Sequence, residues 1–196
     1  THLHLVLSHE EVPHALLRDR LALRAAEAYV AFSGRPERAG ELRDAVHLLR
    51  PGDLPGPAGE TYLAWRRAVE RPVSIKALSR ALPTFEPGQI AAWFDAGKGG
   101  PVNRAGMVLE AVLREVPRAE EAALILADAA LAQALGWDHL VPLLAAGLKR
   151  ADLRKQGDDL RSACHRGLIS STIKAVRQAA ELARRAEHLK AVSPKL

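Results

Sequence analysis

The chain has 196 residues, 48% of them hydrophobic and 26% charged, which suits one well-buried domain and is unlike the composition of a disordered chain. Its single cysteine, Cys164, excludes an intrachain disulfide and any cysteine-based zinc or iron–sulfur centre, and it fits a reducing cytoplasm. The longest apolar run, residues 122–135, contains Asp128 and Gln133. Because a membrane span needs about 20 apolar residues, we expect a buried helix there and no membrane partner.

Helical periodicity runs through the chain, whereas alternating strand patterns are nearly absent. In chain order the periodicity predicts helices over residues 14–34, 41–49, 57–70, 74–82, 87–97, 103–116 and 119–136. Pro51 ends the second helix, Pro57 and Pro87 suit the first position of a helix, and Ser74 suits an N-cap. The helix over residues 119–136 carries only a thin polar line, so it should lie at the centre of the fold.

The charge balance changes near residue 148. Residues 148–196 contain 12 Lys or Arg and 5 Asp or Glu, a net charge of +7, while the rest of the chain has a net charge of −2. Two basic amphipathic helices are predicted there, over residues 149–166 and 168–191. In the second, the predicted buried stripe consists of Ile169, Ile173, Val176, Ala180 and Ala183. The predicted exposed face carries Lys174, Arg177, Arg185 and His188.

These elements predict an all-α fold, a single multi-helix bundle of about eight to ten helices. We expect a helical core domain over residues 1–147 and a basic helical segment over residues 148–196 packed on it. The sequence has neither an initiator methionine nor a signal peptide. We therefore expect it to be a piece of a longer, cytoplasmic protein.

The stretch "RPGDLPGPAG", residues 50–59, interrupts the helices with six prolines and glycines. A helix N-terminus after a glycine-rich loop can bind an anion through its free N–H groups. The residues placed to take part are His47, Arg50, Gly52, Asp53, Gly56, Gly59 and Arg66. The alternative is a rigid connector in which Asp53 is held by Arg50 or by a backbone N–H. We expect the loop to be ordered in either case.

Other polar groups have structural explanations as well. Trp137, Asp138 and His139 could line a pocket, but an inter-helix turn with a core tryptophan and a capping aspartate explains them equally. The glycines around Lys98 lack Walker-loop spacing and predict an exposed turn. Cys164 lacks a suitably placed base, because the adjacent His165 points about 100° away on a helix. The scattered histidines, including His2, His4 and His9, form no recognisable metal set, and no cofactor is predicted.

Nucleic acid is a candidate partner of the basic segment, because Lys and Arg side chains neutralise phosphates. The candidate contacts are Lys149, Arg150, Arg154, Lys155, Lys174, Arg177 and Arg185. Single-strand binders also use stacking aromatic side chains, which the last predicted helix lacks. A solvated helix face is the alternative explanation of these charges.

Three long stretches carry a resemblance to a known family: "LALRAAEAYVAFSGRPERAGELRDAVHLLRPGDLPGPAGETYLAWRR", "LGWDHLVPLLAAGL" and "ARRAEHLKAVSPKL". They resemble the bacterial domain of unknown function 1403, and the loop at residues 50–59 is the most specific part of the match. The resemblance implies a protein common in alphaproteobacteria, often encoded on plasmids and without an established activity. It also implies that the chain continues into a segment similar to a winged helix.

A fainter similarity concerns the same loop. Fic-type adenylyltransferases place the motif His-Pro-Phe-x-x-Gly-Asn-Gly-Arg between two helices, and "HLLRPGDLPGPAG" puts His47, Gly52 and Asp53 at comparable spacing. Leucines replace Pro-Phe, Asp53 replaces asparagine, and the motif arginine has no counterpart. The resemblance therefore implies at most a degenerate nucleotide-binding loop.

Three functions remain open from the sequence. The first is a non-catalytic regulatory or interaction module whose basic C-terminal part contacts DNA. The second is a degenerate Fic-like protein that binds a nucleotide or phosphate at the loop that follows His47. The third is a structural domain that forms homo-oligomers through an apolar helix face.

Overall fold

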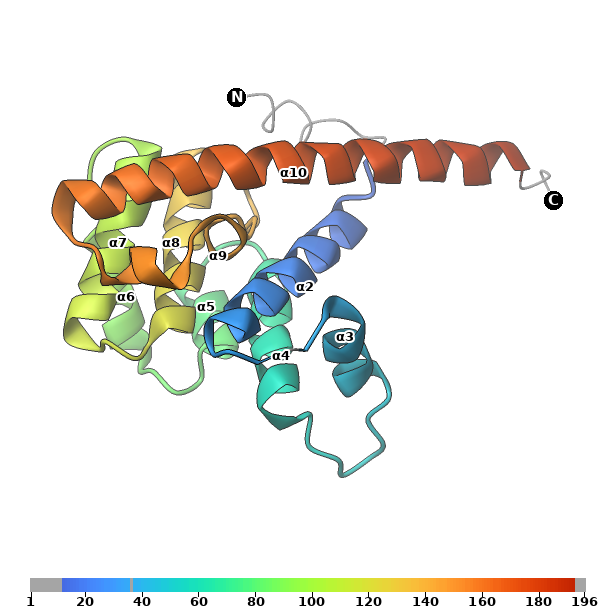
Figure 1. Ribbon diagram of the computed structural model, residues 1–196, viewed down its shortest axis with the longest axis horizontal. Helices are drawn as coiled ribbons and strands as arrows, with labels where there is room; N and C mark the ends of the chain where they lie inside the picture. Colours follow the sequence, from blue (N-terminus) through green and yellow to red (C-terminus); the bar gives the residue numbers. More distant parts are fainter. Residues whose placement is uncertain (1–11, 36, 193–196) are drawn as a thin grey trace.

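The computed structural model describes residues 12–35 and 37–192. Within these residues the regular structure is entirely helical, apart from one isolated bridge between Pro72 and His139. The described part of the chain contains nine α-helices: α2 (His14–Phe32), α3 (Ala39–His47), α4 (Gly56–Glu70), α5 (Ile75–Ala81), α6 (Pro87–Asp95), α7 (Pro101–Glu115), α8 (Glu120–Ala134), α9 (Leu144–Gly147) and α10 (Gly157–Val192). A 3-10 helix, η1, spans Arg150–Arg154. The predicted all-α bundle is confirmed (Figure 1).

Local sequence signals place several helix starts. The Ser74 hydroxyl accepts a hydrogen bond of 3.2 Å from the Ala77 backbone N–H, which confirms the predicted N-cap of α5. A proline occupies the first turn of α4, α6 and α7, where its missing N–H leaves no helical hydrogen bond unmade. The sequence therefore determines where these helices begin.

Helix α8 lies at the centre of the molecule, as predicted. Every residue from 122 to 132 is buried. Helix α7 packs along it, and α2 packs against α4 in the other half of the bundle. Because α8 is apolar on all sides, it can be covered from several directions at once.

The C-terminal region differs from the prediction of two basic helices over residues 149–166 and 168–191. Only the short η1 and one continuous 36-residue helix, α10, are present there. The glycine at the predicted break, Gly167, lies inside α10 and is buried. A Cβ atom on Gly147 would come within 2.3 Å of the Gly167 carbonyl oxygen. A Cβ atom on Gly167 would likewise lie 3.0 Å from the Gly147 carbonyl carbon, so the missing side chains of both glycines let the backbones of α9 and α10 touch.

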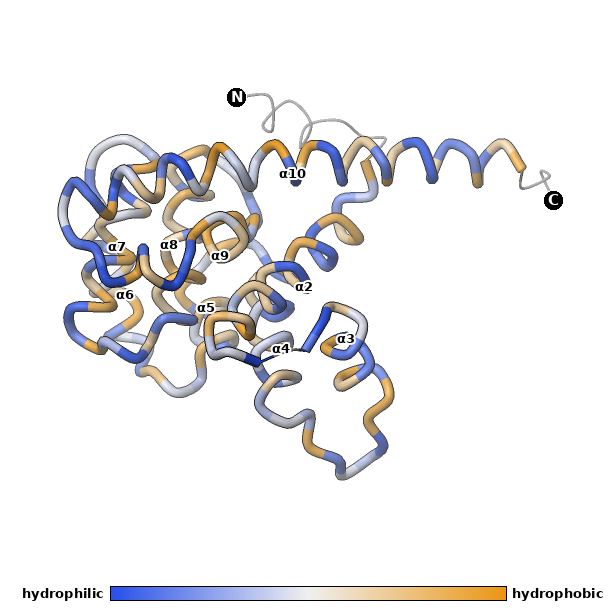
Figure 2. The backbone as a smooth tube through the Cα atoms, viewed as in Figure 1, coloured by the Kyte–Doolittle hydropathy of each residue, from blue (hydrophilic) through white to orange (hydrophobic). Residues whose placement is uncertain are grey.

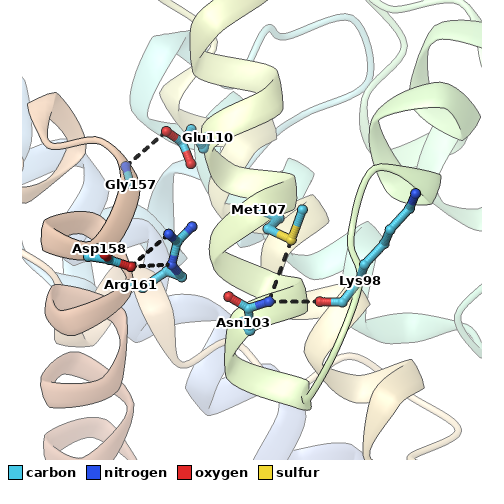
Figure 3. Close-up of polar contacts among 7 residues, drawn as sticks. All are labelled: Lys98, Asn103, Met107, Glu110, Gly157, Asp158 and Arg161. Atoms are coloured by element: carbon cyan, nitrogen blue, oxygen red, sulfur yellow. Dashed lines mark hydrogen bonds and ion pairs between the residues drawn. The ribbon is translucent and has the colours of Figure 1, made fainter.

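The first turns of α10 are attached to α7. The Gly157 backbone N–H donates a hydrogen bond of 2.9 Å to Glu110 Oε1, as Figure 3 shows. The same view shows the predicted turn at Lys98, which is closed by a 3.0 Å hydrogen bond from Asn103 Nδ2 to the Lys98 carbonyl oxygen. Leu160 and Leu168 of α10 belong to the same hydrophobic core as α8. The division into residues 1–147 and 148–196 stays a prediction.

Candidate functional site

The loop that follows α3 forms a hydrogen-bonded turn. The Arg50 backbone N–H donates to Asp53 Oδ2 at 2.9 Å, and the Asp53 N–H donates to the Arg50 carbonyl oxygen at 3.0 Å. Gly52 has a φ of 96°, a conformation that favours glycine. The expected engagement of Asp53 by a backbone N–H is confirmed. His47 and Arg50 are exposed on either side of the α3 terminus.

The two later glycines of the loop have different surroundings. Gly56 has a φ of 67° and open space around it. Gly59 is buried, and a Cβ atom there would lie 2.7 Å from Pro55 Cβ and 3.5 Å from the Ala45 carbonyl oxygen. Its missing side chain therefore allows α3 and α4 to pack closely. Binding of an anion at the first turn of α4 stays a prediction.

Arg66 does not accompany the loop. It lies ten residues beyond Gly56 on α4, about 15 Å along the helix axis. There it lines a pocket of about 390 Å³ between α2 and α4, together with Arg18 and Arg67. The seven residues of the predicted anion set are therefore divided between two places.

The predicted nucleic-acid set also divides into two groups. Lys149, Arg150 and Arg154 are exposed around η1, and Lys155 Nζ forms an ion pair of 2.5 Å with Asp152. The second group lies on α10. Lys174 is about 25 Å along the helix axis from Gly157, the first residue of α10. The predicted face of Lys174, Arg177, Arg185 and His188 is exposed throughout. Arg185 forms an ion pair of 2.5 Å with Glu181.

The predicted apolar stripe of α10 is wrong at three of its five positions, although Val176 and Ala183 are half-buried against the core. Ile169 is 63% exposed and Ile173 is 50% exposed, while Ala180 is also exposed. The buried face instead consists of Leu160, Ala163, Cys164, Gly167, Leu168, Ser171, Ala175, Ala179 and Leu182. These mostly small residues let α10 approach its neighbours closely. Close packing of the backbone, and not the size of the apolar side chains, selected the buried face.

A fully buried carboxylate in α8 supplies a cap that the sequence analysis missed. Asp128 accepts hydrogen bonds from the Leu143 N–H at 3.1 Å and from the Leu144 N–H at 3.1 Å. Burial raises the pKa of Asp128 well above its ordinary value, although both backbone hydrogen bonds oppose this rise. Asp138, the predicted cap, is exposed and instead accepts the Val73 N–H at its backbone carbonyl. The missed signal was a lone aspartate in an apolar helix.

A second carboxyl group of α8, that of the half-buried Glu121, lines a pocket that was also not predicted. This pocket has a volume of about 450 Å³, and Tyr29, Thr61 and Arg118 are among its lining residues. Burial raises the pKa of Glu121 to about 7, and a hydrogen bond with Thr61 only partly opposes the rise. Glu121 Oε1 has no hydrogen-bond partner among the described residues. Its carboxyl group can therefore change protonation near neutral pH.

The remaining candidates have structural surroundings. Trp137 is half-buried against the core. Burial lowers the pKa of His139, with a further contribution from Arg18. Cys164 is buried, and burial raises the pKa of its thiol to about 12, so the thiol stays protonated and weakly nucleophilic. His2, His4 and His9 lie outside the described residues.

Comparison with known proteins gives a family and no function. The family model described as Protein of unknown function (DUF1403) matches residues 1–196. No curated protein and no solved structure matches the chain. In the part of the chain that the structure describes, no helix combines the length and hydropathy needed to cross a bilayer.

Proposed function

The chain belongs to this family of unknown function, and we propose from its geometry that it is an interaction module that contacts DNA through the exposed basic face of α10. One observation carries the proposal. Helix α10 continues past its last buried residue, Leu182, and its end projects beyond the bundle (Figure 1). Basic side chains are exposed before and after that point, at Lys174, Arg177, Arg184 and Arg185.

The shape of this segment suits a nucleic acid. An α-helix with its side chains is about 10–12 Å across, and the major groove of B-DNA is about 12 Å wide. A helix that projects from its bundle can enter that groove without a clash from neighbouring elements. Figure 2 shows hydrophilic residues recurring along the projecting part of α10. Because α10 contains no Phe, Tyr or Trp, we expect contacts with phosphates and little base stacking.

The test is a salt series of DNA binding. The wild-type protein, titrated into a fluorescent duplex between 50 and 200 mM salt, should bind weakly and lose affinity steeply, at about 0.9 log units per log unit of salt for each phosphate contact. Replacing Lys174, Arg177 and Arg185 with glutamine should weaken binding about tenfold or more at low salt and reduce the salt slope by about 2 to 3. Circular dichroism should show unchanged helicity, because all three side chains are exposed.

A matched variant separates this face from the general charge of the protein. Arg71, Lys76 and Arg80 are also exposed, and their replacement by glutamine removes the same charge from the α4–α5 region. This control should bind DNA within about twofold of the wild type if the contacts are local. Equal losses in the two variants, or no binding at 50 mM salt, would overturn the proposal.

Self-association through α10 is the second candidate, because Ile169 and Ile173 expose apolar surface one helical turn apart. The mass of the protein in solution distinguishes the two functions, since DNA contact by the basic face does not require a dimer. The degenerate Fic-like loop has less support, because Gly59 packs against α3 and Arg66 lies in another pocket.

A further inference from the structure

Three arginines meet in the pocket between α2 and α4. Arg18 comes from the first half of α2, and Arg66 and Arg67 come from the second half of α4. The pocket has a volume of about 390 Å³ and also includes the carboxylates of Asp19 and Glu70. None of its lining residues belongs to α10 or to the glycine-rich loop, so neither the proposed DNA contact nor the predicted loop site accounts for it.

Within the described part of the chain, no direct ion pair neutralises the three guanidinium groups. Among the described residues, the ion pairs within 4.0 Å involve Arg43, Lys155, Arg161 and Arg185, and none involves the three pocket arginines. No hydrogen bond from Arg18, Arg66 or Arg67 is found among those residues either. Arg18 and Arg66 are half-buried, and burial lowers the pKa of Arg18 even though Asp19 opposes the change. Three positive charges are therefore gathered and partly desolvated, with Asp19 and Glu70 nearby but in no direct ion pair with them among the described residues.

Such a set of donors fits a phosphate group. Each planar guanidinium presents paired N–H groups whose geometry matches two phosphate oxygens. Asp19 and Glu70, on the same two helices, are acceptors suited to hydroxyl groups. Leu63 and Val69 add apolar surface. The pocket lies within the usual range for small-ligand sites, about 300 to 1,000 Å³.

We propose that this pocket binds a small phosphomonoester of a polyol, such as a sugar phosphate, with Arg18, Arg66 and Arg67 on the phosphate and Asp19 or Glu70 on the hydroxyl groups. A phosphate group is favoured over a carboxylate because it has more oxygens with which to accept hydrogen bonds from three guanidinium groups. A phosphate ester that carries hydroxyl groups is favoured over free phosphate because its hydroxyl groups can donate hydrogen bonds to the two carboxylates.

Calorimetric titration of the full chain at constant ionic strength tests the proposal. The probes are ribose 5-phosphate, inorganic phosphate and ribose, with sodium chloride as the reference salt. Ribose 5-phosphate should bind at millimolar concentration or below, inorganic phosphate about tenfold more weakly, and ribose not measurably, because each part supplies only some of the hydrogen bonds. Equal affinity for inorganic phosphate and ribose 5-phosphate would overturn the proposed recognition of the hydroxyl groups by Asp19 or Glu70. No binding of either would overturn the site.

Variants locate the binding. Arg18→Gln combined with Arg66→Gln should weaken ribose 5-phosphate binding at least tenfold, since charge-assisted hydrogen bonds are lost. Arg67→Gln, at an exposed position that tolerates change, should weaken it several-fold and so tests the site even if the double variant fails to fold. Arg71→Gln combined with Arg80→Gln is the matched control, because both side chains are exposed and lie outside the pocket. Equal loss in this control would assign the effect to general surface charge and overturn the site.

The site is separable from the DNA contact. The variant with glutamine at Lys174, Arg177 and Arg185 should bind ribose 5-phosphate as the wild type does, and the Arg18 and Arg66 double variant should bind DNA as the wild type does. If both variants lose DNA binding and ribose 5-phosphate binding together, the two sites are not independent. That result would overturn the proposed phosphomonoester site between α2 and α4.

Discussion

The Glu121 carboxyl group shows how a single residue gains an unusual property from its surroundings. It lies in the first turn of α8, where the helix dipole favours a negative charge. Burial nevertheless outweighs the dipole and raises the pKa of Glu121 to about 7, from an ordinary value of 4.5. The sequence alone indicated only a thin polar line on this helix, because the burial of Glu121 depends on Tyr29, Thr61 and Phe85, which are distant in sequence.

This shift predicts that Glu121 makes the stability of the protein depend on pH. Between about pH 4.5 and 7 the folded state holds a proton on Glu121 that the unfolded state has lost. The free energy of unfolding therefore falls as the pH rises through this window, by at most about 3 kcal/mol. Glu121→Gln removes this dependence. Urea unfolding at pH 5 and pH 8 should show the variant gaining stability relative to the wild type at the higher pH.

Comparison with Glu187→Gln isolates the effect. Glu187 is exposed on α10, so its carboxyl group stays in water in both the folded and the unfolded states. Its replacement should change stability equally at both pH values. A constant difference between the Glu121→Gln variant and the wild type from pH 5 to pH 8 would contradict the raised pKa of Glu121.

At the scale of elements, sequence periodicity predicted the helices of the bundle well and the contacts of α10 poorly. Local signals are enough to predict the helix starts at Ser74 and Pro87, because an N-cap or a first-turn proline acts on its own helix. The buried face of α10 is instead selected by contact with other helices. Ile169 and Ile173 indicated the wrong face because they are larger and more apolar than the Gly and Ser residues that are buried. Gly167 suggested a break in the helix because its contact with Gly147 depends on the packing of α9 against α10, which the local sequence does not reveal.

The contact between α9 and α10 gives a prediction for Gly147. An alanine Cβ there would lie 2.3 Å from the Gly167 carbonyl oxygen, so the two helices would have to separate. Gly147→Ala should therefore lower the free energy of unfolding by about 1 to 3 kcal/mol. Gly40→Ala is the matched control, because Gly40 is helical and has open space around it. It should be neutral or gain up to about 1 kcal/mol. Equal stability of the two variants in urea titrations would show that the α9–α10 contact is looser than described.

The candidate sites were only partly predictable for a related reason. The exposure of Lys174 and Arg177 follows from their own helix and was predicted correctly. The arginine pocket requires Arg18 to meet Arg66 and Arg67 across the α2–α4 contact. Nothing in the local pattern around Arg66 indicates that partner, so the sequence placed it with the nearer loop. Sites formed by one element are accessible to sequence analysis, whereas sites formed between elements depend on packing.

At the scale of the whole molecule, the end of α10 and the loop after α3 lie at opposite edges of the bundle (Figure 1). The core extends along α10 as far as Leu182 and no further among the described residues. Residues 184–192 are exposed except for the half-buried Ala186. The molecule therefore separates a part that maintains the fold from a projecting part that is free to contact a partner.

Truncation after residue 183 tests this separation directly. Because the deleted part of α10 contributes no buried residue, the free energy of unfolding should change by less than about 1 kcal/mol. The same deletion removes Arg184, Arg185 and Lys190, so DNA binding at low salt should weaken about tenfold or more. Urea unfolding and duplex titration of the same preparation measure both effects. A truncated protein that unfolds readily would show that the projecting turns support the bundle. One that binds DNA unchanged would place the contact on the exposed cations that remain, either Lys174 and Arg177 or those around η1.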